Sequence, residues 1–158
     1  MTNEGAATEM RVLTLPPTRR DGEVTHRLLH AAHVECQLCS DPSEAVREIG
    51  RGAGALLLTE KILTVPGFDE ILETLRKQEP WSDLPIVMLL QGGALSAGAS
   101  QMLSSLSNVT LLERPAPIRT VISAVQAALR ARVRQYQIRE QFEQIRRAEA
   151  ERQQLLER

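Results

Sequence analysis

Cys36 and Cys39 form the one C-x-x-C pattern of this 158-residue chain. This spacing occurs in redox pairs and in halves of zinc sites, but a redox pair would follow a strand and open a helix, and a zinc site needs further ligands. The pair lies inside the segment VECQLC, which is predicted to be a strand, where side chains three apart point to opposite faces. We therefore expect two ordinary, half-buried thiols and no metal site.

Histidines and isolated acids are the next candidates. His26 and His30 lie four residues apart, with His33 just beyond them, and this spacing on a helix can bind Zn²⁺. The same pattern is more typical of solvent-exposed histidines on a helix. Asp69 and Asp83 fall at a helix start and in a loop, where carboxylates cap helices or are solvated. None of these residues is expected to form a site.

Nucleotide-binding loops are missing from the sequence. No G-x-G-x-x-G follows the first apolar run, which ends in prolines, and no G-x-x-x-x-G-K-[ST] occurs. The glycines between 50 and 54 precede a strand and are typical of a helix stop. We expect no cofactor.

Apolar runs alternate with segments of helical periodicity along residues 11–129. Short apolar runs predict strands, and apolar residues three and four apart predict helices. Asp41 followed by Pro42 is typical of a helix start. The predicted strands are 11–15, 34–38, 54–59, 84–90 and 109–113, and the predicted helices cover 22–32, 42–50, 68–78, 96–106 and a segment that begins at Pro117.

The continuous apolar runs at 54–59 and 84–90 indicate strands that are buried on both faces. Five strand–helix units with such strands form a parallel sheet covered by helices on both sides. Right-handed crossovers then give an α/β fold with a doubly wound, five-stranded parallel sheet, (βα)5.

Composition excludes several functions. The net charge is −1 and aromatic residues make up 3%, so neither a polycation nor base-stacking platforms for nucleic acid are expected. No apolar run is long enough to cross a membrane. Residues 1–10 are polar with no apolar core, so we expect a disordered N-terminus and a cytoplasmic protein.

Residues 130–158 differ from the rest of the chain. They contain eight Arg, five Glu and neither Gly nor Pro, so the last helix is predicted to run unbroken for about 60 Å. Ile138, Phe142, Ile145 and Leu156 follow heptad spacing and define a seam. Because such a helix cannot bury its far half against its own domain, we expect a homodimer through a parallel coiled coil, to which Val133 and Tyr136 contribute.

The region 11–129 resembles the CheY-like receiver domain of two-component response regulators. The resemblance rests on LRKQEPWSDLPIVMLL, similar to that family's third helix and fourth strand, and on LLERPAPIRTVISAVQAAL, similar to its K-P segment and last helix. It implies a flavodoxin-like sheet. In receivers, two acids after the first strand hold Mg²⁺ and an Asp ending the third strand accepts a phosphoryl group. A Ser/Thr and a Lys ending the fourth and fifth strands contact that phosphoryl group.

This sequence departs from the pattern at each of those positions. The metal-binding pair falls on Leu15 and Pro16, and the acceptor falls on Glu60 or, one residue earlier, on Thr59. The hydroxyl position falls on Leu90 and the lysine on Arg114, which precedes Pro115. These residues outline a vestigial acceptor pocket, in which Glu60 and Arg114 are expected to form a salt bridge that imitates the activated charge arrangement.

The resemblance thus predicts a degenerate, non-catalytic pseudo-receiver like the N-terminal modules of bacterial sensor histidine kinases. Its last helix would lead to a downstream PAS or histidine kinase domain, where any kinase activity would lie. The alternative is a functional receiver with an unusual acceptor at Glu60 or Thr59.

Overall fold

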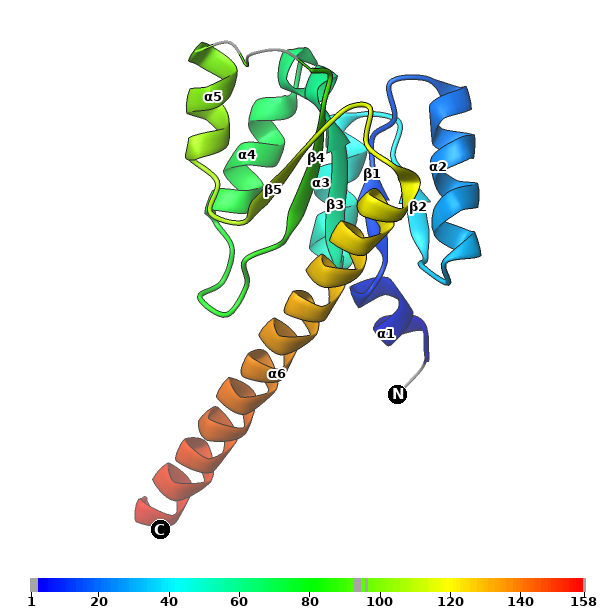
Figure 1. The fold of residues 1–158 in the computed structure, drawn as a ribbon. Helices are drawn as coiled ribbons and strands as arrows, with labels where there is room; N and C mark the ends of the chain where they lie inside the picture. The colour runs from blue at the N-terminus through cyan, green and yellow to red at the C-terminus, as the bar shows by residue number, and fades with distance from the viewer. Residues whose placement is uncertain (1–2, 93–94, 96, 158) are drawn as a thin grey trace.

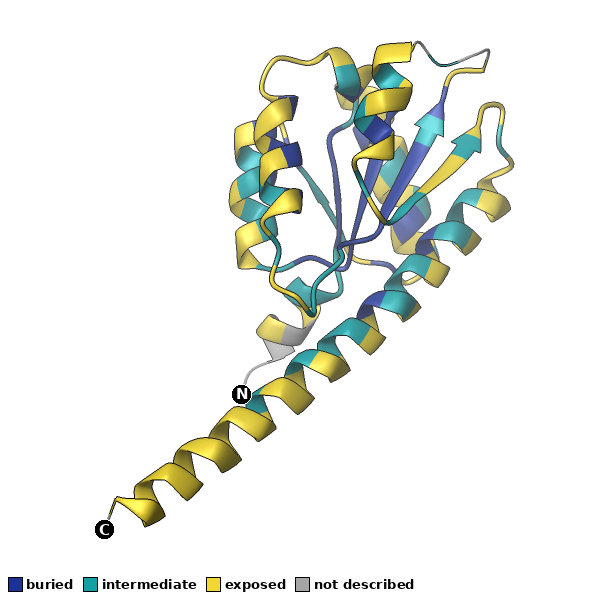
Figure 2. Ribbon diagram, turned by 90° about the vertical axis from the view of Figure 1, so that its left-hand side faces the viewer, coloured by how far each residue is buried: buried dark blue, intermediate teal, exposed yellow. Residues whose placement is uncertain are grey.

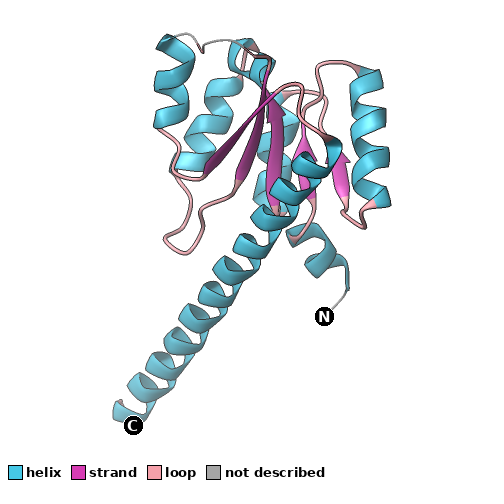
Figure 3. Ribbon diagram, in the orientation of Figure 1, coloured by secondary structure: helices cyan, strands magenta, loops and turns pink. Residues whose placement is uncertain are grey.

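The computed structural model describes residues 3–92, 95 and 97–157. The strands are β1 (Val12–Thr14), β2 (Cys36–Leu38), β3 (Ala55–Thr59), β4 (Ile86–Leu90) and β5 (Val109–Glu113) (Figures 1 and 3). The helices are α1 (Asn3–Glu9), α2 (Arg19–Ala31), α3 (Pro42–Arg51), α4 (Phe68–Arg76), α5 (Ala97–Ser104) and α6 (Ile118–Leu156), with a 3₁₀ turn η1 (Glu60–Thr64). Residues 1, 2, 96 and 158, which belong to segments predicted from the sequence, lie outside the described residues.

The five strands form one parallel sheet in the order β2-β1-β3-β4-β5. The predicted doubly wound α/β fold is therefore confirmed, and the order is that of flavodoxin-like sheets. All strands end at the same edge, and the loops that follow them carry the candidate pocket.

Alternate side chains of the strands face two separate cores. Leu56, Leu58 and Met88 pack under α3, α4 and α5 on one face. Leu57 and Val87 pack under α2 and α6 on the other. Strands buried on both faces are consequently apolar at every position, which is why their sequences carry no alternation.

Local signals account for where the helices begin. The side chain of Asp41 accepts a hydrogen bond from the Glu44 backbone N–H, and Pro42 occupies the first turn of α3, as predicted. Thr18 caps α2 in the same way. Pro117 precedes α6, where its missing N–H costs no hydrogen bond.

The N-terminus differs from the prediction. We expected residues 1–10 to be disordered, whereas Asn3–Glu9 forms helix α1. The carboxylate of Glu9 pairs with the guanidinium of Arg139, 130 residues later in the chain. This tertiary contact explains the order, and no local pattern in the first ten residues reports it.

Helix α6 is unbroken from Ile118 to Leu156, as predicted. It begins beside the C-terminal end of β5, crosses one face of the sheet and continues beyond the domain (Figure 1). The predicted boundary at residue 129/130 falls within its packed part, since side chains contact the domain as far as Arg139. Beyond that point the helix is almost wholly exposed (Figure 2). Among the described residues, no helix is long and apolar enough to span a membrane.

Candidate functional site

The first strand ends without any acidic side chain. Leu15 is buried in the core beneath α3 and α4, and Pro16 packs against α2. A Cβ atom at Gly22 of α2 would lie only 2.9 Å from Cγ of Pro16, so this close approach requires a glycine. Apolar packing thus occupies the position where a receiver holds its metal-binding acids.

Glu60 follows β3 directly and opens the turn η1. One of its carboxylate oxygens accepts a hydrogen bond from the backbone N–H of Gln91 at 2.9 Å, just after β4. The predicted salt bridge with Arg114 is wrong: among the ion pairs of the described residues, none joins the two side chains. The carboxylate instead ties the ends of two neighbouring strands together.

Arg114 lies at the same edge of the sheet, where its backbone, and not its side chain, makes the contact with a neighbouring strand. Its backbone N–H donates to the carbonyl oxygen of Leu90 at 2.9 Å, which continues the pairing of β4 with β5. Its side chain is exposed, as is Pro115, whereas Thr59 and Leu90 are buried. The buried Leu90 side chain provides no hydroxyl at the position that contacts phosphate in receivers.

The clefts at this edge also separate the predicted residues. Pro16 lines a cleft of about 610 Å³ between α2 and the end of β2. Arg114 and Pro115 line another of about 430 Å³ beside β4 and α6. The structure therefore brings Glu60 to the exit of β4 but leaves Pro16 and Arg114 in different clefts.

The Mg²⁺ ion that the receiver fold implies does not fit these residues. Hard cations need several oxygen ligands, usually with one or two carboxylates. Leu15 and Pro16 provide none, which leaves Glu60 as the one carboxylate among these positions, with one of its oxygens accepting a hydrogen bond from the Gln91 N–H. In the described part of the chain, no three His, Cys, Asp or Glu side chains converge as a metal-ligand set.

The cysteines and histidines occupy unremarkable surroundings. Cys36 is partly buried, Cys39 is 3% exposed, and both are free thiols. Burial raises the pKa of Cys36 to about 11 and that of Cys39 to about 12, so the nucleophilic thiolate is scarce at neutral pH. His26 and His30 are exposed, with their rings stacked 6.2 Å apart.

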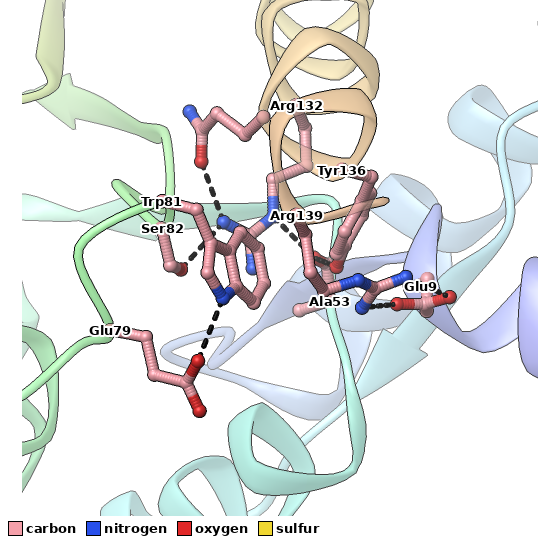
Figure 4. Close-up of polar contacts among 9 residues, drawn as sticks. Glu9, Ala53, Glu79, Trp81, Ser82, Arg132, Tyr136 and Arg139 are labelled. Atoms are coloured by element: carbon pink, nitrogen blue, oxygen red, sulfur yellow. Dashed lines mark hydrogen bonds and ion pairs between the residues drawn. The ribbon is translucent and has the colours of Figure 1, made fainter. Parts of the chain in front are cut away.

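A second group of side chains lies at the opposite edge of the sheet, where α6 leaves the domain. We call Glu9, Trp81, Arg132, Tyr136 and Arg139 the arginine–aromatic cluster (Figure 4). They come from α1, from the loop before β4 and from three successive turns of α6. Together they attach the exit helix to the domain.

Arg132 is the buried centre of this cluster, with 6% of its surface exposed. Its Nε donates to the carbonyl oxygen of Ala53 at 3.0 Å, and its Nη1 donates to Ser82 Oγ at 2.8 Å and Gln135 Oε1 at 2.7 Å. The guanidinium carbon lies 5.3 Å from the Trp81 ring centroid and 4.6 Å from that of Tyr136. Neutral oxygens and aromatic faces thus surround this cation, which forms no ion pair with a carboxylate of the described residues, and desolvation lowers its pKa.

Arg139 approaches the same two rings, at 5.2 Å from Trp81 and 4.5 Å from Tyr136, and pairs with Glu9. The Tyr136 hydroxyl donates to the carbonyl oxygen of Ala53 at 2.7 Å. Burial raises the pKa of this hydroxyl, so it remains a proton donor. The cluster therefore holds α6 through hydrogen bonds, an ion pair and ring contacts.

Sequence reasoning missed this cluster. We expected Tyr136 to contribute with Val133 to a dimer contact, but Tyr136 packs on its own domain, whereas Val133 is 40% exposed. The spacing of residues along α6 contains a signal for the cluster, because polar residues continue its buried face. That face carries Val125, Arg132, Tyr136 and Arg139. Arginines on a charged helix are ordinarily solvated, and their partners are distant in sequence.

Comparisons with solved structures agree with this architecture. A sensor protein from Polaromonas sp. is 17% identical with a TM-score of 0.60, covering 77% of this chain and 97% of that chain. The magnesium-bound receiver domain of a Pseudomonas aeruginosa sensor histidine kinase is 20% identical with a TM-score of 0.59, covering 75% and 96%. A fusion that contains a yeast trimeric coiled coil is 16% identical with a TM-score of 0.63, covering 92% and 90%. No protein-family model and no curated protein sequence matches.

The chain therefore has the CheY-like receiver fold found in two-component signalling proteins, followed by a long C-terminal helix. At these identities the likeness establishes the fold alone.

Proposed function

We propose that this chain is a non-catalytic pseudo-receiver module of a two-component signalling protein. The observation that carries the proposal is the state of the sheet edge where phosphoryl transfer would occur. Leu15 and Pro16 provide no metal ligands, and the Glu60 carboxylate is hydrogen-bonded to the Gln91 N–H. Phosphoryl transfer depends on a metal ion and cations to stabilise developing charge, and Leu15 and Pro16 occupy the positions whose carboxylates hold that metal in receivers.

Phosphate uptake tests this proposal. The full chain would be incubated with acetyl phosphate and Mg²⁺, or with beryllofluoride, alongside a phosphorylatable receiver domain as the positive control. We expect the mass of the chain to show no added phosphoryl group. We also expect its fluorescence spectrum to show no Mg²⁺-dependent change. A phosphoryl adduct that disappears in Glu60→Gln, as an acid-labile acyl phosphate, or in Thr59→Val, as an acid-stable phosphoester, would establish the alternative, a working receiver with an unusual acceptor.

The signal would leave the domain through α6, because one face of this helix contacts the domain and a different face is available to a second copy of the chain. Arg132, Tyr136 and Arg139 face the domain, and each is followed six residues later by a residue of the seam. Six residues correspond to about 600°, so the seam lies about 120° round the helix from the docked face. Ile138, Phe142 and Ile145 are 44%, 47% and 54% exposed, which leaves them accessible to a second copy.

We therefore propose a cytoplasmic homodimer in which the paired tails connect the domain to a downstream PAS or histidine kinase domain. The rigid attachment of α6 by the arginine–aromatic cluster supports this role, since a movement of the domain would be transmitted to a helix that it holds firmly. The oligomeric state and the effect of the cluster are testable separately.

A further inference from the structure

An apolar cavity lies between α2 and the first turns of α6. Its volume is about 120 Å³, and it reaches the side chains of Leu57 and Leu89 on the sheet. Leu28 of α2 and Ile122 of α6 contribute to its lining. A cavity lined this way is unfavourable for water, which needs several polar partners.

The cavity adjoins the cleft of about 430 Å³ that contains Arg114, since Leu89, Ala116 and Val121 line both. Gln91 and Arg114 provide the polar part of this second cleft. The combined space has an apolar end and a cationic end, and its size suits a small molecule.

Among the described residues, the cation at the polar end is unpaired: the Arg114 side chain makes no ion pair or hydrogen bond with them, so its guanidinium donors are available to an anion. Exposed apolar surface lies close to the other end, because Ile118, which lines the cavity, is 54% exposed. Both features would be satisfied by one ligand that carries an anionic group on an apolar body.

We propose that the apolar cavity and the adjoining cleft together bind a small monocarboxylate with an aliphatic body of several carbon atoms. The carboxylate would accept hydrogen bonds from the guanidinium of Arg114, which matches a carboxylate in geometry and charge. The aliphatic body would enter the apolar cavity and leave water for contacts with Leu57, Leu89 and Ile122. A free inorganic anion would leave the apolar cavity unfilled, so the body of the ligand is part of the recognition. This inference goes beyond the proposed function and stands independently of it.

Octanoate and its neutral counterpart 1-octanol are suitable probes, used below the concentration at which octanoate self-associates. Methyl NMR of the full chain would report binding at the Leu and Val side chains, and the titration would give the dissociation constant. For a ligand of this size we expect octanoate to bind with a constant of about 0.1–1 mM and to shift the Leu57, Leu89 and Val121 methyl signals.

Variants separate the two ends of the site. Arg114→Gln should weaken octanoate binding about threefold to tenfold and leave 1-octanol binding unchanged. Arg130→Gln, an exposed arginine of α6 remote from the cavity, is the matched control and should change neither. Leu28→Trp should fill the cavity and weaken the binding of both ligands. If this variant fails to fold, the effect of Arg114→Gln on octanoate binding but not on 1-octanol binding still tests the proposal.

The proposal would be overturned if octanoate showed no saturable binding, if Arg114→Gln and Arg130→Gln behaved alike, or if the shifted methyl signals lay elsewhere. Binding of an amphipathic peptide at these methyl groups, with no octanoate binding, would also overturn it and assign the groove to a protein partner. None of these outcomes bears on phosphate uptake, so failure here is distinguishable from failure of the pseudo-receiver proposal.

Discussion

Arg132 and Tyr136, one turn apart on α6, donate hydrogen bonds to the same acceptor, the carbonyl oxygen of Ala53. Ala53 lies two residues before β3, so this shared acceptor joins the exit helix to the central strand of the sheet. A helix held in this way cannot rotate about its axis without breaking both bonds. These two hydrogen bonds lie at the edge of the sheet where the strands begin, whereas Glu60 lies at the edge where they end. Helix α6 runs from the second edge to the first.

Replacing Arg132 by alanine should destabilise the domain by about 2–4 kcal/mol. The change removes three hydrogen bonds made by a cation and the packing of the guanidinium between two rings. Urea unfolding followed by circular dichroism measures the loss. Arg130→Ala, two residues earlier and exposed, should change stability by no more than about 0.5 kcal/mol. Equal effects of the two substitutions would mean that the cluster contributes nothing to the attachment of α6.

Glu60 and Arg114 should behave independently of each other. Because the Glu60 carboxylate accepts from the Gln91 N–H and no ion pair joins it to Arg114, the effects of Glu60→Gln and Arg114→Gln on unfolding free energy should add within about 0.5 kcal/mol. A double-mutant cycle provides the test. A coupling energy of about 1 kcal/mol or more would show that the two side chains meet in solution.

Local and periodic signals predicted the sheet, the helix order and the length of α6. Asp41 with Pro42 marks the start of α3, and apolar runs mark the strands, because each signal depends on neighbours within a few residues. The cluster around Arg132 and the order of α1 depend on partners 50 to 130 residues away, so the spacing on α6 could indicate a buried face but not what that face contacts. At the candidate pocket, strand ends placed Glu60 and Arg114 on the right edge, but side-chain direction decided that they do not pair.

The pairing of Arg11 with Glu48 should make stability pH-dependent. Arg11 Nη2 donates to the Glu48 carboxylate at 2.7 Å, and this hydrogen bond holds the pKa of Glu48 below its ordinary value. A lowered pKa contributes stability above the ordinary value of about 4.5, and this contribution is lost as the pH falls through the folded-state value.

Glu48→Gln should therefore destabilise the protein at neutral pH, and the difference from the unsubstituted chain should shrink progressively below about pH 4.5. Urea unfolding across the range from pH 3 to pH 7 measures the difference. Glu73→Gln, in an exposed pair with Arg76, is the control and should have little effect at any pH. A pH-independent loss in Glu48→Gln would contradict a contribution from the ionised carboxylate.

The two thiols should react slowly in the folded protein. Because burial raises the pKa of Cys36 to about 11 and of Cys39 to about 12, the thiolate fraction at pH 8 is small. We expect alkylation by iodoacetamide at pH 8 to be at least about a hundredfold slower than in the urea-unfolded chain, where cysteine has its ordinary pKa of about 8.5. Mass spectrometry over time gives both rates. Rapid labelling of the folded chain would reopen a redox role for the pair.

The tail should set the oligomeric state through its seam. Phe142→Glu combined with Ile145→Glu should shift the protein toward monomer, because each seam side chain contributes about 1.5–3 kcal/mol when buried and a buried unpaired carboxylate opposes association. A few such residues per chain, after the entropy of association is deducted, give a dimer with a dissociation constant in the micromolar range. Sedimentation equilibrium measures it.

Two controls separate the seam from the rest of the helix. Gln137→Glu combined with Gln144→Glu adds the same two charges to the same stretch but away from the seam, and should leave the dimer intact. Truncation after Glu140 removes Phe142, Ile145 and Leu156 while keeping Arg132, Tyr136 and Arg139, so the shortened chain should remain folded and become monomeric. Truncation after Arg130 would also remove the cluster that attaches α6, and its instability would be confused with a loss of pairing. A monomeric full-length chain at high concentration, a trimer, or a dimer that survives truncation after Glu140 would each show that the seam does not form the expected two-stranded interface.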